Sequence, residues 1–243
     1  MSRNFRKVEL LGVPYYCQGM HDALCTYYSA AMLLATLHPE YQDRFGRGAR
    51  RQRVGLKVED PLIKNFPGPS KDSNEHVLSS WFYRGAYLKD ACNALNTSMK
   101  EDDHKTRFKH ALYTHHDSTF ELIMNNIDHG LPVMIGWTTV DYGVHCALVV
   151  GYRKARLSWL ILHDPSGGDE VCWEVLKEID KSRLSLVTVV RHDGPRPDRM
   201  TVVFNNKAEI TQIHRWWPDG CEIRYHPIAK LYDMAKGEST RAT

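Results

Sequence analysis

A continuous apolar stretch near the N-terminus, residues 25–37, places the strongest constraint on how this chain can fold. The segment CTYYSAAMLLATL carries no charged residue and is apolar on nearly every side, which is typical of a helix buried on several faces. Asp22 precedes it as the expected N-cap, and Pro39 lies just beyond its expected end. Such a helix has to lie at the centre of a fold, covered by other elements.

The same stretch puts Cys25 in the first turn of the expected helix. The partial positive charge of a helix N-terminus favours thiolate over thiol, so a sulfur at this position can act as a nucleophile. Cysteine is also among the most often buried residue types, so a packing role is the plainer interpretation of the position alone. A nucleophilic role requires a base from elsewhere in the chain.

Length and composition are those of a globular protein with a substantial core. The 243 residues are 42% hydrophobic and 25% charged, with a net charge of +3, which gives no support to a nucleic-acid or anionic-membrane partner. No run reaches the ~20 apolar residues of a membrane-spanning helix. The charged N-terminus does not resemble a signal peptide, so we expect a cytoplasmic protein, with export by a dedicated secretion system left open. The cysteines are expected to be reduced, because none has a short paired spacing: Cys17, Cys25, Cys92, Cys146, Cys172 and Cys221.

Hydrophobic periodicity predicts helices first and strands afterwards. After an extended lead-in over 8–16 and the Cys25 helix, further helices are predicted over 74–95 and from Asp117 to a stop at Gly130. Short apolar runs predict strands over 131–137, 144–152, 158–163, 184–191, 200–204, 211–217 and 221–226. This order favours an α+β fold, expected as one domain over 1–243 with its core at about 10–180 and a β extension at about 184–230.

Two long polar segments, 40–73 and 96–116, are predicted to be loops. The first carries five arginines between Arg44 and Arg53, but no aromatic residues alternate with them as stacking sites for bases. The second is rich in histidine but lacks the ligand spacing of a metal site: His104, His110, His115 and His116. We therefore expect no metal and no cofactor.

A histidine and an aspartate on two neighbouring predicted strands supply a candidate base. Strands 144–152 and 158–163 are joined by a short turn and should pair antiparallel. If Tyr152 stands opposite Leu157, counting back along both strands places His145 directly opposite Asp164. Opposed side chains have Cβ atoms about 5 Å apart and can hydrogen bond. A carboxylate on one imidazole nitrogen leaves the other to take a proton from the Cys25 thiol.

Taken together, these segments resemble the papain-fold cysteine peptidases, most closely the bacterial peptidases that process the double-glycine leaders of bacteriocins. The resemblance covers about residues 10–180. It is carried by VPYYCQ at 13–18, CTYYSAAML at 25–33, HGLPVMIG at 129–136, GVHCALVVGY at 143–152 and LHDPSGG at 162–168.

The resemblance implies a papain-like fold, with an N-terminal nucleophile-bearing helix packed on a C-terminal antiparallel sheet. It implies that Cys25 is the nucleophile, His145 the general base and Asp164 its orienting group. Gln18 would donate its amide to the oxyanion, beside the backbone N–H of Cys25. The expected reaction is cleavage of a bond in a peptide or protein substrate through an acyl-enzyme. Glutamine deamidation and acyl transfer use the same chemistry, and a non-catalytic binding module is a further alternative.

Overall fold

The computed structural model describes residues 5–17, 24–45, 52–53, 61–66, 86–113, 116–139, 143–154, 157–167, 170–173, 176, 184–192, 194–204, 210–216 and 222–224. Within these ranges, helices and a large antiparallel sheet form an α+β fold. None of the helices described there is both long and apolar enough to span a membrane.

The predicted central helix is present as α1 (Cys25–Leu37), and every one of its residues is buried. Its N-cap is Leu24, so the assignment of Asp22 as the cap was wrong, and Asp22 itself lies outside the described residues. The Leu24 carbonyl accepts the N–H groups of Tyr27 and Tyr28, which closes the first turn immediately after Leu24. Burial on all sides follows from the absence of a polar face.

The predictions for the two long polar segments were wrong in part. The first contains α2 (Glu40–Phe45) and α3 (Pro61–Asn65), which bury Tyr41, Phe45 and Leu62. Within the helix expected over 74–95, the described part is not helical at residues 86–87, where Tyr87 is extended, and α5 runs from Leu88 to Glu101. Residues 67–85 lie outside the described part of the chain.

The helix predicted from Asp117 is α6 (His116–Asp128), and Gly130 ends it as expected. Gly130 has φ +73°. Its N–H donates to the Ile127 carbonyl, and the N–H of Leu131 donates to the Asn126 carbonyl, both at 3.0 Å. This pair of bonds is the Schellman arrangement that glycine favours at a helix end.

The main sheet has the order β12-β11-β10-β1-β6-β5-β9-β4. Off this path, β7 also pairs with β6, and β8 pairs with β7. Its predicted strands are present: β5 (Val133–Thr139), β6 (Gly143–Lys154), β7 (Trp159–His163), β9 (Leu184–Arg191), β10 (Arg199–Phe204), β11 (Ile210–Trp216) and β12 (Glu222–Arg224). Strands not predicted as such are β1 (Phe5–Leu10), the short parallel pair β2 (Tyr16–Cys17) and β3 (Gln52–Arg53), β4 (Arg107–Tyr113) and β8 (Glu170–Cys172).

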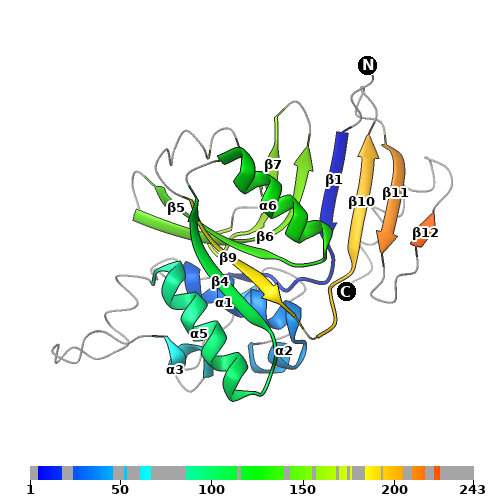
Figure 1. Cartoon of the computed structure of the whole chain (residues 1–243). Coiled ribbons are helices and arrows are strands. Elements are labelled where there is room, and N and C mark those ends of the chain that lie inside the picture. The colour runs from blue at the N-terminus through cyan, green and yellow to red at the C-terminus, as the bar shows by residue number, and fades with distance from the viewer. Residues whose placement is uncertain are drawn as a thin grey trace.

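Helices cover both faces of this sheet. Figure 1 shows α6 on one side and α1, α2, α3 and α5 on the other. Helix α1 lies against β6, where the Ser29 hydroxyl donates to the Cys146 carbonyl at 3.4 Å. The core therefore places the N-terminal tip of α1 near the beginning of β6.

Strands β6 and β7 pair antiparallel as predicted, but in a different register. Tyr152 stands opposite Leu160 rather than Leu157, and a bulge lies between Val149 and Gly151. Beyond the bulge, Leu148 pairs with His163, the last residue of β7. The prediction that His145 and Asp164 are a directly opposed ladder pair was therefore wrong.

Candidate active site

Cys25 is the first residue of α1 and is buried, with 7% of its surface exposed. N–H groups in the first turn of a helix have no partner within the helix and carry its partial positive charge. The Cys25 side chain hydrogen bonds to His145 on β6. A thiol and an imidazole from distant parts of the sequence thus meet at the tip of a buried helix.

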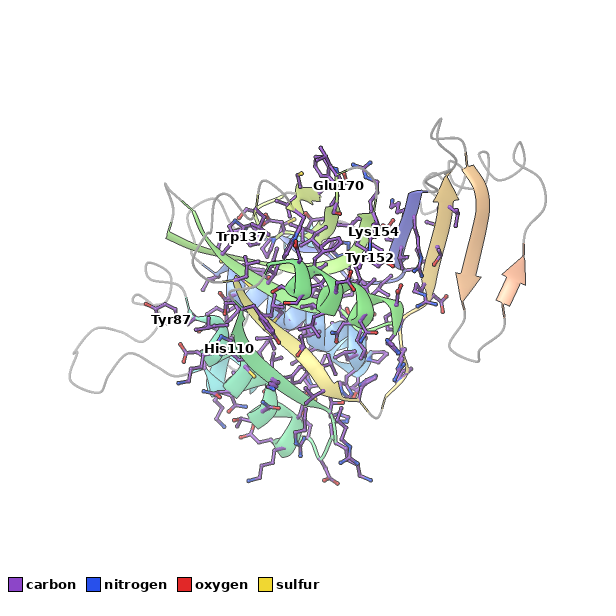
Figure 2. The ribbon with its side chains drawn as sticks, turned by 45° about the horizontal axis from the view of Figure 1, so that its top comes forward. Tyr87, His110, Trp137, Tyr152, Lys154 and Glu170 are labelled. Carbon is purple, nitrogen blue, oxygen red and sulfur yellow. The ribbon has the colours of Figure 1, made fainter. Side chains whose placement is uncertain are left out.

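His145 is held from its other side by Asp164, which directly follows β7. The ring Nε2–H of His145 donates to both carboxylate oxygens, each at 2.9 Å. With Nε2 occupied in this way, Nδ1 is the nitrogen available to the thiol. The ring also meets Trp137 edge-on, with centroids 4.9 Å apart, because the two residues are directly paired between β5 and β6. Figure 2 labels Trp137 at this end of the sheet, well separated from Tyr152 farther along β6.

Neighbouring residues hold the backbone and the carboxylate of Asp164 in place, with the carboxylate facing His145. The N–H of Ser166 donates to Oδ1 at 2.7 Å, a local turn that aspartate favours. The Tyr15 hydroxyl donates to the Asp164 carbonyl at 2.9 Å. The Tyr15 ring stacks on His163 with centroids 4.5 Å apart, and the His163 ring donates from Nδ1 to the Pro14 carbonyl at 3.0 Å.

These contacts change the protonation of His145. Burial lowers the pKa of His145, but its hydrogen bonds with Asp164 and Cys25 and the charges of both groups outweigh burial and raise the pKa to about 9. The imidazole is therefore mostly protonated at neutral pH. A protonated imidazole beside a cysteine is an arrangement in which acid–base chemistry can assist attack of the sulfur on a carbonyl.

A comparison with protein-family models identifies the family of the chain. The model of the Peptidase C39-like family matches residues 10–181, more than half of the chain. The chain belongs to the Peptidase C39-like family. No curated protein sequence matches it as a relative. Membership supports a function of the cysteine-peptidase type, and a peptidase family implies a peptide or protein substrate.

Cys146 and Cys92, two further cysteines among the described residues, have different surroundings from Cys25. Cys146 is fully buried against α1, and burial raises the pKa of its thiol well above the usual value. Burial likewise raises the pKa of Cys92 on α5. Both thiols are therefore neutral packing groups.

Gln18, the predicted oxyanion donor of the C39-like site, lies outside the described residues, as does Cys221. Of the Arg44–Arg53 segment, Arg44 lies in α2 and pairs with Asp102 at 3.2 Å. The histidines of the second polar segment are dispersed: His110 on β4 hydrogen bonds to Ser185 at 2.8 Å, His104 follows α5, and His116 begins α6. His115 lies outside the described residues.

Residues that the sequence interpretation did not assign to the site also support it. Tyr15 and Ser166 hold Asp164, and Trp137 packs against His145. The Thr26 hydroxyl, next to the nucleophile, donates to the Ala86 carbonyl at 2.7 Å and ties α1 to the segment that enters α5. Their only signal in the sequence was their position in or beside the segments that carry the family resemblance.

Proposed function

We propose that this protein is a thiol peptidase in which Cys25, His145 and Asp164 act together on the carbonyl of a peptide bond. One observation carries the proposal: a single imidazole ring contacts a thiol at the N-terminus of a buried helix and a carboxylate on its opposite side. The Cys25 helix next to an antiparallel sheet is consistent with a papain-like arrangement.

The reaction begins with the thiolate of Cys25 and the imidazolium of His145. The sulfur attacks the carbonyl carbon, and the carbonyl electron pair moves to oxygen, which forms a tetrahedral oxyanion. When the C–N bond breaks, His145 gives its proton to the leaving amine and a thioester remains. Water then attacks the thioester while His145 takes a proton from it, and the C–S bond breaks to release the acid product and restore the Cys25 thiolate and the His145 imidazolium.

Asp164 has two roles in this sequence. Its two contacts with Nε2 hold the ring so that Nδ1 faces the sulfur, and its charge stabilises the imidazolium. For the oxyanion, we propose the backbone N–H of Cys25 together with the side-chain amide of Gln18. Donors already in place where negative charge develops contribute strongly to such reactions.

We further propose that residues 1–243 form one domain. The sheet continues without interruption from β4 through β9, β5, β6 and β1 to β10, β11 and β12. Strand β1 supports this, because it pairs with β6 of the candidate site and with β10 of the C-terminal extension.

To test the proposal, the protein is incubated with a pool of peptides of many sequences. Mass spectrometry then identifies the new peptide termini. Wild-type protein should generate new termini, and Cys25→Ser and His145→Gln should not. Cys172→Ser is the matched control, because Cys172 lies on β8 and is partly exposed; it should cleave like the wild type. Cleavage by Cys25→Ser would overturn the proposal. A gain of about one dalton at glutamine without cleavage would assign the same site to deamidation.

A further inference from the structure

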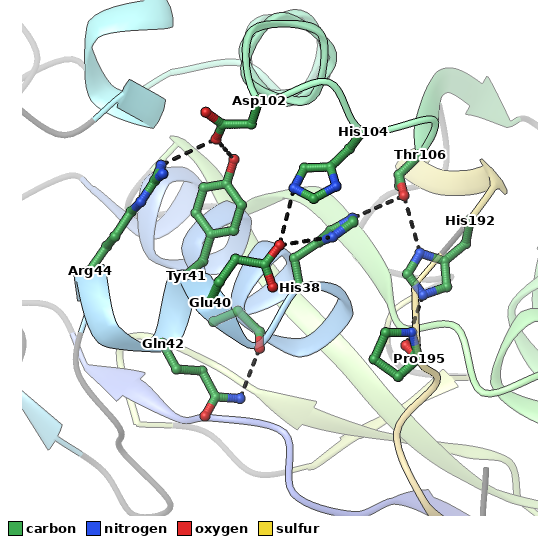
Figure 3. Close-up of polar contacts among 11 residues, drawn as sticks. His38, Glu40, Tyr41, Gln42, Arg44, Asp102, His104, Thr106, His192 and Pro195 are labelled. Carbon is green, nitrogen blue, oxygen red and sulfur yellow. Dashed lines mark hydrogen bonds and ion pairs between the residues drawn. The ribbon is translucent and has the colours of Figure 1, made fainter. Parts of the chain in front are cut away.

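A second cluster of polar side chains lies at the opposite end of α1 from Cys25. His38 caps the C-terminus of α1, Glu40 begins α2, and His104 lies in the loop between α5 and β4. The Glu40 carboxylate is 3.0 Å from Nε2 of His104 and 3.5 Å from Nδ1 of His38 (Figure 3). The His38–Glu40–His104 cluster is about 20 Å from Cys25, the length of 13 helical residues.

A chain of hydrogen bonds supports a form of His38 in which Nδ1, the nitrogen that faces Glu40, carries a lone pair. Nε2–H of His192 donates to the Pro195 carbonyl at 2.8 Å, so in a neutral His192 ring Nδ1 accepts from the Thr106 hydroxyl at 3.2 Å. The Thr106 oxygen in turn accepts from Nε2–H of His38 at 2.9 Å. Nδ1 of a neutral His38 then points a lone pair at a carboxylate.

A cation placed between Nδ1 of His38 and the Glu40 carboxylate would be bound by both atoms. The His38 side chain is only 3% exposed, so water competes poorly for this nitrogen. The ligand atoms of the three residues all lie within 4.8 Å of one another. Two ligands bound to zinc at tetrahedral angles are about 3.3 Å apart, given Zn–N distances of about 2.0–2.1 Å. The separations of 3.0 and 3.5 Å from Glu40 fit that spacing.

We propose that the His38–Glu40–His104 cluster binds a divalent transition-metal ion of the zinc type. Two imidazole nitrogens and one carboxylate oxygen suit Zn²⁺, whereas Mg²⁺ and Ca²⁺ prefer oxygen ligands alone. The hydrogen bond from His38 to Thr106 is the outer contact that metal-binding histidines usually make with their second nitrogen. The cluster is open to solvent at Glu40, whose side chain is 52% exposed. Water therefore supplies the fourth ligand.

The position of the cluster indicates what a bound ion would do. It joins the junction of α1 and α2 to the loop after α5, and the C-terminal end of a helix carries partial negative charge that favours a cation. Asp102 is close by but already accepts from the Tyr41 hydroxyl and pairs with Arg44, so it is left out of the ligand set. The ion stabilises this end of α1 and takes no part in chemistry at Cys25.

The test is zinc binding to metal-free protein in a Cys25→Ala background, which removes the candidate nucleophile as a competing ligand. Titration calorimetry and thermal unfolding with ZnCl₂ should show one site and a higher unfolding temperature, with no effect of MgCl₂. Glu40→Gln and His104→Gln each remove a partly exposed ligand and should weaken zinc binding at least tenfold. Co²⁺ should give the intense visible absorption of a tetrahedral complex in the parent but not in Glu40→Gln or His104→Gln.

His129→Gln is the matched control, because His129 is exposed and hydrogen bonds to its own helix at Asn125. It should bind zinc like the parent. Absence of zinc binding in the parent, or binding unchanged in Glu40→Gln and His104→Gln, would overturn the proposal. Because all variants lack Cys25, the result does not depend on whether the protein is a peptidase.

Thr106 gives a second and independent test. Thr106→Val keeps the shape of the side chain but removes the hydroxyl that accepts from His38, so zinc affinity should fall about 10- to 100-fold. Thr106→Ser restores the hydroxyl and should restore the affinity. Equal affinity in Thr106→Val and the parent would contradict the assignment of Nδ1 of His38 as a ligand.

Discussion

His145 on β6 and Asp164 after β7 hydrogen bond at 2.9 Å without being a ladder pair. The last pair on this side, Leu148 with His163, aligns Asp164 with Ala147, two residues from His145 along β6. Residues two apart on a strand share a face, and diagonal neighbours are within reach of longer side chains. Asp164 has already left the strand, so its carboxylate can turn toward the ring.

Replacing Asp164 by asparagine tests what its charge contributes. Without the carboxylate charge the pKa of His145 should fall from about 9 toward its usual value, so the ring loses its proton at a lower pH. The imidazole beside Cys25 is then less often protonated at neutral pH, and alkylation of Cys25 by iodoacetamide at pH 7 should slow by roughly tenfold or more. Mass spectrometry of the labelled peptides from pH 5 to 10 measures this rate.

Asp103→Asn is the control for this substitution. Asp103 is exposed in the turn after α5 with φ +57°, a conformation that asparagine adopts well. Its alkylation profile should match the wild type. An unchanged profile in Asp164→Asn would contradict the role assigned to the carboxylate.

The raised pKa of His145 also predicts how stability depends on pH. Its folded value of about 9 lies above the unfolded value of 6.5, so the folded state holds this proton more tightly. The resulting stability is fully present below about pH 6.5 and is lost as pH rises through about 9. The difference is on the order of 3 kcal/mol for a shift of this size.

Urea unfolding at pH 6 and pH 9.5, with reductant present, measures this effect. The free energy of unfolding of the wild type should fall more between these pH values than that of His145→Gln. Equal losses in the two proteins would show that His145 does not hold its proton more tightly when folded.

The β6–β7 hairpin shows why the His145–Asp164 contact could be predicted although its register could not. At Tyr152 the observed pairing is displaced by three residues from the prediction, which alone would put the two side chains on opposite faces. The bulge after Val149 takes up one residue and leaves a displacement of two. An even displacement preserves the face. Hydrophobic patterning locates such strands but does not reveal a bulge.

Other features depended on contacts between distant segments. Strand β4 has a weak pattern, with His110 and Lys109 in it, and its pairing with β9 decides its conformation. The charge-free α1 was readily predicted because a run of this composition can only be buried. The His38–Glu40–His104 cluster was not predicted, because its residues come from two segments far apart in the sequence. Spacing rules detect only ligands that lie close together in the sequence.

Gly151 lies next to the bulge in β6, at the point where β1 pairs with β6. Alanine should not fit there. A Cβ at this position would press against the backbone carbonyl of Val8, which is held in the β1–β6 ladder. We expect Gly151→Ala to lower the free energy of unfolding by about 1–3 kcal/mol.

Gly136→Ala is the comparison for Gly151→Ala. Its Cβ would meet Cδ1 of Leu88 at 2.7 Å, the end of a flexible side chain that can move. Loss of backbone freedom in the unfolded chain also offsets part of the strain, so its cost should be below about 1 kcal/mol. Urea unfolding of both variants gives the comparison, and the reverse order would contradict it.

Thr26 stabilises the tip of α1 through its hydroxyl. Thr26→Val keeps the branched shape but leaves the Ala86 carbonyl without this donor, so the free energy of unfolding should fall by about 1–2 kcal/mol. Thr26→Ser keeps the donor and should recover most of the loss. Chemical denaturation of the three proteins tests this, and equal stability of the valine and serine variants would rule out a contribution from the hydrogen bond.

Tyr15 joins the segment before α1 to the loop that carries Asp164. Tyr15→Phe keeps the ring stacked on His163 but removes the hydroxyl that donates to the Asp164 carbonyl. The Asp164 backbone then loses an anchor, so peptide cleavage should slow severalfold with a loss of about 1 kcal/mol in stability. The charge on Asp164 is unchanged, so the pH dependence of Cys25 alkylation should stay as in the wild type, unlike that of Asp164→Asn. A shifted pH profile in Tyr15→Phe would mean that the hydroxyl acts on the electrostatics of His145 rather than on the position of Asp164.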